Sequence, residues 1–228
     1  MLMFPNHKKD KNHKMEMFKK YAHLWAVLLF CLFLIAVFFK IATELGQKHL
    51  ELFDQAIINA VDALRNPWLT EFMKTLTTLG SAKAMITIVL FFWLLYLIYK
   101  KYFKDTALIS IMLTITWLMN DVLKWLYHRS RPITSRLVNA SGYSFPSGHA
   151  MISLVFYGMV AYFLWVNLKT PWAKYFSAGF FALLVFCIGI SRVYLGVHYP
   201  SDVIAGFAAG GVMLTGAIIG LQMSGDKD

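Results

Sequence analysis

The sequence predicts an all-α integral membrane protein, a bundle of six transmembrane helices with two short amphipathic helices between spans one and two. Of the 228 residues, 58% are hydrophobic and 16% aromatic, which is unlike an average soluble domain. The apolar residues come in blocks of about 16 to 20 with few charges inside them, as a bilayer crossing requires. Cationic segments flank these blocks. The length suits a single domain covering 1–228.

The first element is a basic tail over 1–23, followed by span one over about 24–42. The tail carries six lysines against Asp10 and Glu16. The apolar run after it ends without the small residues of a signal-peptide cleavage site. We therefore expect an uncleaved cytoplasmic tail.

The segment 43–83 predicts two amphipathic helices that lie at the extracytoplasmic interface. Apolar residues recur in the first helix at helical spacing, while Glu51, Asp54 and Asp62 fall on other faces. Asn66 and Pro67 supply a cap and a first-turn proline for the second helix, whose pattern continues to Gly80. The pair either covers the outer end of the bundle or guides a lipid headgroup inward. The apolar residues of the first helix are Leu50, Phe53, Ile57, Val61 and Leu64.

Five further apolar blocks complete the six spans, at about 84–99, 106–127, 150–167, 175–190 and 203–221. The short loops 100–105 and 168–174 are cationic, like the N-terminal tail, and all three fall on one side of the membrane. The positive-inside rule makes that side cytoplasmic, together with both termini. Cys31 and Cys187 lie inside spans, where we expect them to be packing residues.

Span six contains two pairs of glycines with four-residue spacing, Gly206 with Gly210 and Gly216 with Gly220. Small residues at this spacing allow two helices to approach closely inside a membrane. Because one chain supplies six spans, we expect these glycines to pack within the chain rather than to form a dimer. The protein is expected to be a monomer.

Three polar segments interrupt the apolar sequence within 124–202, each at the end of a membrane-length block: 124–132, 146–149 and 191–202. They contribute the cations Lys124, Arg131 and Arg192 to one face. Taken singly, Lys124 could snorkel to the interface or pair with Asp121. Arg131 could be a loop cation beside the helix stop at Pro132, and Arg192 could be only an interfacial anchor. Charges beside a membrane are costly, so three on a shared face indicate a function. They flank hydrophobic blocks instead of forming a stripe, which argues against nucleic-acid binding.

The second segment, Pro146-Ser147-Gly148-His149, opens span four. A helix N-terminus presents unpaired N–H groups and the positive end of a dipole, and both attract anions. Ser147 can donate through its hydroxyl, and Gly148 lets a phosphate approach the backbone. The segment could also be only a loop-to-helix junction.

The third segment places His198 one helical turn before Asp202. A carboxylate bonded to one imidazole nitrogen fixes the tautomer and leaves the other lone pair free for attack. The pair could instead be structural or belong to a metal site, although nearby cations would repel a divalent ion. Phosphoryl transfer needs charge stabilisation, a nucleophile and an acid for the leaving oxygen. The three cations, His198 and His149 can supply these without a metal.

Together the segments read Lys-x6-Arg-Pro, Pro-Ser-Gly-His and Ser-Arg-x5-His-x3-Asp, which resembles the signature of the type 2 phosphatidic acid phosphatase superfamily. The resemblance implies that His198 is a nucleophile that forms a phosphohistidine, supported by Asp202, and that His149 protonates the leaving oxygen. It also implies a set of residues that hold the phosphoryl group: Lys124, Arg131, Ser147, Gly148 and Arg192.

The resemblance further implies a lipid-phosphate phosphatase of the bacterial cell membrane that needs no metal or cofactor. Within the superfamily the chain looks like the small bacterial phosphatases that convert phosphatidylglycerophosphate to phosphatidylglycerol. The alternative is an undecaprenyl diphosphate phosphatase, which would recycle the lipid carrier of cell-wall synthesis. A lipid-phosphate binding or transport protein is the non-enzymatic alternative, which an oriented nucleophile argues against. Six spans argue against the soluble vanadium haloperoxidases of the same superfamily.

Overall fold

The computed structural model describes residues 7–99, 103–133 and 136–225. In that part of the chain eight helices follow one another: α1 His7–Thr43, α2 Lys48–Asp62, α3 Pro67–Leu79, α4 Ala82–Tyr99, α5 Phe103–Tyr127, α6 Gly148–Asn167, α7 Pro171–Tyr194 and α8 Pro200–Gly225. All except α2 and α3 are long and apolar enough to cross a membrane. The predicted fold class, six spans with two shorter helices between spans one and two, is confirmed.

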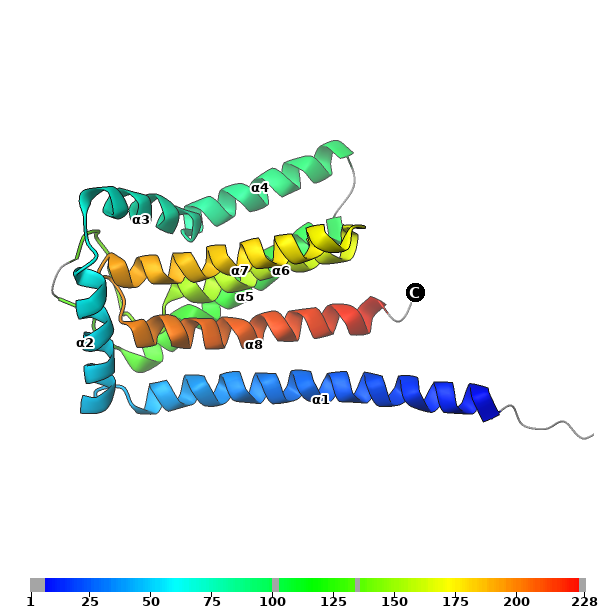
Figure 1. Ribbon diagram of the computed structural model, residues 1–228. Coiled ribbons are helices and arrows are strands. Elements are labelled where there is room, and N and C mark those ends of the chain that lie inside the picture. The colour runs from blue at the N-terminus through cyan, green and yellow to red at the C-terminus, as the bar shows by residue number, and fades with distance from the viewer. Residues whose placement is uncertain (1–6, 100–102, 134–135, 226–228) are drawn as a thin grey trace, which may run out of the picture.

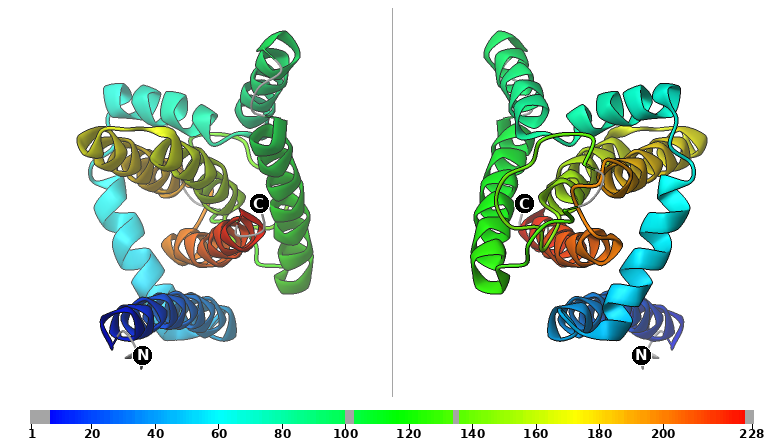
Figure 2. Two further views of the ribbon diagram at one scale, coloured as in Figure 1. Left: turned by 90° about the vertical axis from the view of Figure 1, so that its right-hand side faces the viewer. Right: turned by 90° about the vertical axis from the view of Figure 1, so that its left-hand side faces the viewer.

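The six long helices lie side by side, with α6 packed against α5, α7 and α8 (Figures 1 and 2). Helix α1 packs on α8, and α4 packs on α5, so α1 and α4 occupy opposite edges of the bundle (Figure 2). The main core is apolar and surrounds α6, where Val155 and Met159 are fully buried beside Ile188 of α7.

Glycines bring α8 against α6 near the start of both helices. A Cβ atom on Gly206 would lie 2.7 Å from the carbonyl oxygen of Ser147, and one on Gly210 would lie 2.7 Å from that of Met151. The first glycine pair therefore packs within the chain, as predicted. The second pair does not: a Cβ on Gly216 or Gly220 would meet no described atom within 4 Å.

The helices α2 and α3 differ in their orientation. Helix α2 runs across the ends of the spans, whereas α3 slopes inward along α7 (Figure 1). The predicted cap is present at the start of α3, where the side chain of Asn66 accepts the N–H of Leu69 at 2.9 Å and Pro67 follows. At its other end, the carbonyl oxygen of Leu79 accepts a hydrogen bond from Tyr157 of α6 at 2.9 Å. This contact draws α3 into the bundle.

The apolar stripe expected in this segment is buried only in part, and a charged residue of α2 is buried with it. Leu50 is buried and Phe53 and Leu64 are exposed, while Asp54 is only 1% exposed. The buried face is chosen by polar partners of Asp54 on other segments, which helical periodicity of apolar residues does not detect.

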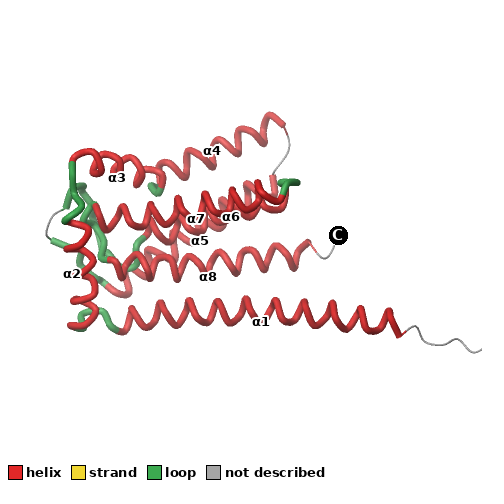
Figure 3. The backbone as a smooth tube through the Cα atoms, in the orientation of Figure 1, coloured by secondary structure: helices red, strands yellow, loops and turns green. Residues whose placement is uncertain are grey.

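The connections divide between the two ends of the bundle (Figure 3). One end holds the long loop between α5 and α6, the short loop before α8, and helix α2. The opposite end holds the start of α1, the end of α8 and the connection between α6 and α7. Helix α1 begins at His7, so it includes much of the segment expected to be a tail. Residues 1–6 of that segment lie outside the described part.

Candidate active site

The predicted site residues come from separate segments that meet at the end of the bundle crossed by α2. The last turn of α5, the following loop, the start of α6, the end of α7 and the start of α8 all contribute. His149 is the common neighbour of the group, since it lies within electrostatic range of Lys124, Arg131, Arg192 and His198. The structure therefore gathers the three polar segments into one cluster.

The start of α8 positions the buried pair His198 and Asp202. Helix α8 begins at Pro200, and the carboxylate of Asp202 reaches back to accept the N–H of Tyr199 at 2.9 Å, as capping acids do at this position. Oδ2 of the same carboxylate lies 3.4 Å from Nδ1 of His198. That separation is long for a hydrogen bond, and Nδ1 has no other partner among the described residues.

The other imidazole nitrogen faces Arg131, whose Nη1 lies 3.1 Å from Nε2 of His198. A guanidinium can only donate hydrogen bonds, so this contact requires a lone pair on Nε2. The proton of neutral His198 then belongs on Nδ1, toward Asp202. Arg131 is held in place by three carbonyl oxygens, those of Ser141, Gly142 and Val197.

Burial controls the protonation of both partners. It lowers the pKa of His198 to about 4, even though Asp202 acts in the opposite direction. The imidazole is therefore neutral at neutral pH, and Nε2 keeps the lone pair that faces Arg131. Burial also lowers the pKa of Arg131, but a guanidinium remains charged throughout the physiological range.

The two other cations of the cluster each have one neutral partner. Nζ of Lys124 donates to the carbonyl oxygen of Tyr143 at 3.0 Å, and Nη1 of Arg192 donates to the hydroxyl of Thr77 at 2.8 Å. Nε of Arg192 is buried with no hydrogen-bond partner in the described part of the chain. Because Lys124, Arg131 and Arg192 also repel one another, this region is suited to receive an anion.

Ser147 and Gly148 form the start of α6, as predicted. The hydroxyl oxygen of Ser147 accepts the N–H of Ala150 at 3.5 Å, so Ser147 is the N-cap of the helix. Its own N–H donates to the carbonyl oxygen of Asp202 at 2.9 Å, which ties the two helix starts together. A Cβ on Gly148 would lie 2.8 Å from Oδ1 of Asn120, so the side chain of Asn120 packs closely against the backbone at this position.

His149 projects from the first turn of α6 toward the junction between α3 and α4. A Cβ on Gly80 would lie 3.0 Å from Cδ2 of its imidazole and 2.5 Å from Ile188. Gly80 thus makes room for the ring. Within the described residues the ring makes no hydrogen bond, so its nitrogens remain available to a ligand.

Several polar residues that contact this cluster are not among the residues predicted from the sequence. Arg129 bonds Asp202 and Asp54, and the start of α8 contributes Ser201 to the same group. Arg129 lies inside the first polar segment, so its charge was a usable signal. Asp54 and Thr77 belong to helices that gave only an amphipathic pattern, and nothing in that pattern marks them.

The chemistry of the donor set does not resemble a metal site. No group of three or more His, Cys, Asp or Glu side chains that could hold a metal ion occurs in 7–99, 103–133 and 136–225. Asp202, the carboxylate beside His198, bonds Arg129, and so does Asp54.

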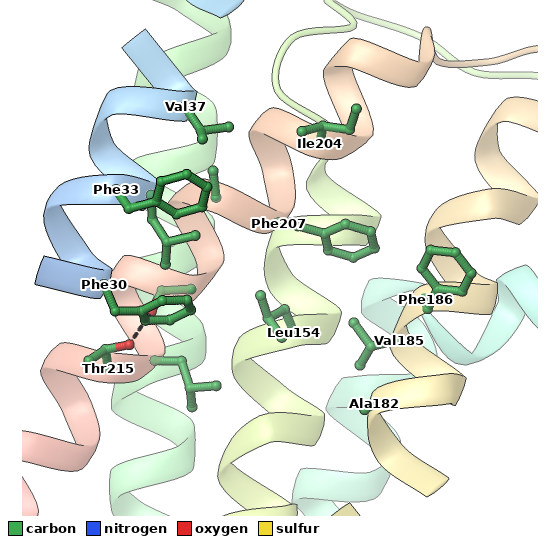
Figure 4. A pocket seen from close by; sticks show the side chains of 14 residues that line it. Phe30, Phe33, Val37, Leu154, Ala182, Val185, Phe186, Ile204, Phe207 and Thr215 are labelled. Atoms are coloured by element: carbon green, nitrogen blue, oxygen red, sulfur yellow. Dashed lines mark hydrogen bonds between the residues drawn. The ribbon is translucent and has the colours of Figure 1, made fainter. Parts of the chain in front are cut away.

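Two cavities lie near the cluster without being lined by its predicted residues. An apolar cleft of about 680 Å³ opens between α1, α7 and α8, with Leu154 of α6 at its base (Figure 4). Its lining is typical of a surface in contact with lipid chains. A polar cavity of about 370 Å³ lies on the other side of Arg129 and Asp54, and Glu51 and Gln55 of α2 also line it.

Comparison with known proteins places the chain in a family. The PAP2 superfamily model matches residues 106–226, more than half of the chain. Phosphatidylglycerophosphatase B of Bacillus subtilis is 37% identical over 188 residues, which cover 81% of this chain and 88% of that protein. The undecaprenyl-diphosphatase of Sulfolobus acidocaldarius is 35% identical over 124 residues, 51% of this chain and 55% of that protein.

A solved structure agrees with these sequence matches. The crystal structure of a transmembrane PAP2-type phosphatidylglycerolphosphate phosphatase from Bacillus subtilis superposes with a TM-score of 0.78 at 31% identity, covering 85% of this chain and 96% of that one. The helical bundle, the gathered polar segments and these matches lead to one conclusion: the chain belongs to the PAP2 superfamily and is a membrane lipid phosphatase.

Proposed function

We propose that this protein removes the terminal phosphate of phosphatidylglycerophosphate, through a phosphohistidine formed on His198. The substrate assignment is supported by the similarity to phosphatidylglycerophosphatase B, which extends over most of both chains. The observation that carries the reaction assignment is the 3.1 Å contact between Nε2 of His198 and Nη1 of Arg131. It puts the lone pair of a neutral imidazole among the cations that would hold a phosphoryl group.

In the first step, Nε2 of His198 attacks phosphorus and an N–P bond forms while the P–O bond to the lipid breaks. The leaving alkoxide takes a proton from protonated His149. Lys124, Arg131 and Arg192 stabilise the charge on the equatorial oxygens, and the start of α6 at Ser147 and Gly148 supplies backbone N–H groups. Asp202 holds Nδ1–H of His198, so the ring stays in the reactive tautomer.

In the second step, neutral His149 takes a proton from water, and the water oxygen attacks phosphorus. The N–P bond breaks, the lone pair returns to Nε2, and inorganic phosphate leaves. His149 is then protonated again and His198 is neutral, as before the first step. Every proton transfer in this scheme passes through His149.

The second candidate substrate is undecaprenyl diphosphate. The similarity to an undecaprenyl-diphosphatase favours it, although that match covers about half of each chain. The same residues would act, with the undecaprenyl phosphate oxygen as the leaving group in place of an alkoxide.

Phosphate release by the purified protein in detergent tests the substrate assignment. The panel contains phosphatidylglycerophosphate, phosphatidic acid and undecaprenyl diphosphate, assayed with chelator present. We expect the highest kcat/KM for phosphatidylglycerophosphate. A higher kcat/KM for undecaprenyl diphosphate would reverse the assignment and leave the phosphatase reaction intact.

We also propose that the site faces outward and that the monomer suffices for activity. Counting the spans alternately along the sequence puts the cationic loops 100–105 and 168–174 on the side opposite the polar segments, and the positive-inside rule supports a cytoplasmic side for such loops. Single cysteines introduced into these loops, in a variant without Cys31 and Cys187, should resist an impermeant thiol reagent on intact cells. Ready labelling from outside would invert the orientation. One chain contributes every proposed site residue.

A further inference from the structure

Asp54 of α2 is a buried carboxylate with an unusually full set of partners. The residue is only 1% exposed. Oδ1 accepts the N–H of Ser201 at 2.8 Å, and Oδ2 accepts the hydroxyl of Ser201 at 2.6 Å and Nη2 of Arg129 at 2.8 Å. Removing a carboxylate from water costs several kcal/mol, roughly, unless such partners replace the water. A residue that only covered the bundle end would not need this arrangement.

The contacts with Ser201 fix the start of α8. Ser201 is the second residue of that helix, so its N–H is one of the amides that have no partner within the helix. Asp54 satisfies this amide from a different helix, and its negative charge also suits a helix N-terminus. The next residue along α8 is Asp202, so Asp54 restrains the turn that carries the partner of His198.

Arg129 lies between the two carboxylates and divides its nitrogens between them. Nη1 donates to Oδ1 of Asp202 at 2.6 Å, while Nη2 donates to Asp54. The guanidinium also lies over the ring of Tyr199, with Cζ 4.0 Å from the ring centroid. Burial alone would lower the pKa of Arg129, but Asp202 and Asp54 outweigh burial and raise it. The bridge between the carboxylates is therefore permanently charged.

This division matters because a guanidinium can also hold one carboxylate with two nitrogens in parallel. In that arrangement Arg129 would occupy both oxygens of Asp202. Because Nη2 of Arg129 bonds Asp54, only Nη1 is left for Asp202, and it bonds Oδ1. Oδ2 then remains for the N–H of Tyr199 and for His198, 3.4 Å from Nδ1.

We infer that Asp54 is a positioning residue for the phosphatase reaction, which holds Arg129 so that Asp202 keeps one oxygen for His198. The inference rests on the proposed role of His198 as nucleophile. Asp54 touches neither the substrate nor His198, and acts through Arg129 and the first turn of α8. It makes α2 part of the active site rather than a cover for it.

The test compares Asp54→Asn with Glu51→Gln, using hydrolysis of phosphatidic acid by the full-length protein in detergent. Glu51 is an exposed carboxylate of α2 that lines the same polar cavity. We expect kcat of Asp54→Asn to fall by about 10- to 100-fold, the usual effect of losing a group that orients a catalytic residue indirectly. Its KM should stay within about threefold, because the phosphate-binding cations are unchanged. Glu51→Gln should keep the wild-type kcat.

Two conservative variants separate positioning from folding. Asp54→Glu restores the charge and should recover part of kcat. Arg129→Lys keeps the cation but cannot bridge two carboxylates through separate nitrogens, so its kcat should also fall at unchanged KM. If Asp54→Asn is unfolded at the assay temperature by its thermal midpoint, Arg129→Lys decides. A wild-type kcat in Arg129→Lys, or equal losses in Asp54→Asn and Glu51→Gln, would overturn the inference.

The variant His198→Ala, measured in the same assay, keeps the two proposals apart. Activity in His198→Ala would refute the nucleophile assignment itself. An inactive His198→Ala together with a wild-type kcat in folded Asp54→Asn would refute only the role of Asp54.

Discussion

The two sides of His198 are built differently. On the Nδ1 side, Asp202, Arg129 and Asp54 form a chain in which every charge meets an opposite charge at 2.6 to 2.8 Å. On the Nε2 side, Lys124 and Arg192 each have one neutral partner, and Nε of Arg192 has none within the described residues. Paired charges resist rearrangement, whereas cations without a counter-charge gain the most electrostatic stabilisation when an anion binds.

The difference indicates that one side is complete before substrate binds and the other is completed by the substrate. A pre-organised nucleophile needs no reorganisation during the reaction. A pocket of mutually repelling cations is relieved by a phosphate, so binding itself supplies the missing charge.

The largest loss of activity is expected for His198, the residue that lies between the two sides. His198→Ala should abolish phosphate release, a loss of at least about 10⁴-fold, because no other group can form the N–P bond. Phosphate release from phosphatidic acid measures it, with the thermal midpoint in detergent as a check on folding. A residual rate within about 100-fold of wild type, in a folded variant, would remove His198 from the covalent step.

The next effect concerns His149, whose importance should depend on the leaving group. A lipid alkoxide needs a proton, so His149→Ala should lose about 10²–10⁴-fold on a lipid phosphate monoester. Nitrophenolate is a much better leaving group, and the loss on nitrophenyl phosphate should be visibly smaller. His198→Ala should be inactive on both substrates. Equal losses of His149→Ala on both would make His149 a phosphate-binding residue.

A third prediction sets Arg192 against Arg129. Arg192→Met should lower kcat/KM by about 10²–10³-fold, since a cation facing the transition-state charge is lost. Its thermal midpoint should not fall, because Arg192 has no carboxylate partner among the residues that the structure describes. Arg129→Met should lower the midpoint strongly, since losing one member of a buried pair typically costs about 3–5 kcal/mol.

Binding of inorganic phosphate tests the contrast between Arg192 and Arg129 in a second way. It should raise the midpoint of the wild type by mass action and have a smaller effect on Arg192→Met. Equal midpoints for the two arginine variants would contradict the contrast between the sides.

The smallest effect is a pH dependence of stability that originates at His198. Its pKa is about 4 in the folded protein and 6.5 in the reference state, so the unfolded chain binds more protons between these values. The free energy of unfolding should therefore fall as pH drops through this window, by at most about 3 kcal/mol in total. Above the window the contribution is complete.

Comparing the wild type with His198→Asn isolates the pH dependence of stability that comes from His198. Thermal midpoints measured at pH 7 and pH 5 should drop further for the wild type than for the variant. Parallel curves for the two proteins would show that His198 is not buried in its neutral form.

Much of the fold follows from the sequence because the bilayer imposes simple rules. Span length and cationic flanks predict six long helices, and the cap at Asn66 and Pro67 predicts the start of α3. Gly206 and Gly210 were recognisable by spacing, but Gly216 and Gly220 share that spacing without the contact. Spacing reports which residues share a face, and only the packed bundle decides which face meets a neighbour.

The site divides in the same way. The residues of the polar segments could be predicted because their types and spacing suit phosphate chemistry. Asp54 could not be predicted in this way. It lies about seventy residues before the first polar segment, and the apolar pattern of its helix put it outside the apolar stripe. Its partners, Arg129 and Ser201, come from two other segments. A buried ion pair between distant segments leaves no periodic trace in one sequence.

The packing of α1 against α8 joins the first and last spans of the chain. During synthesis at about 5–20 residues per second, roughly 10 to 35 s separate the appearance of these two helices. Until α8 is made, helix α1 lacks the helix it packs against, and Asp54 lacks its partner Ser201. Assembly of this end of the bundle is therefore a late event that depends on the final helix. A chain truncated before α8 would lose both Asp202, which supports the proposed nucleophile His198, and the helix that packs against α1.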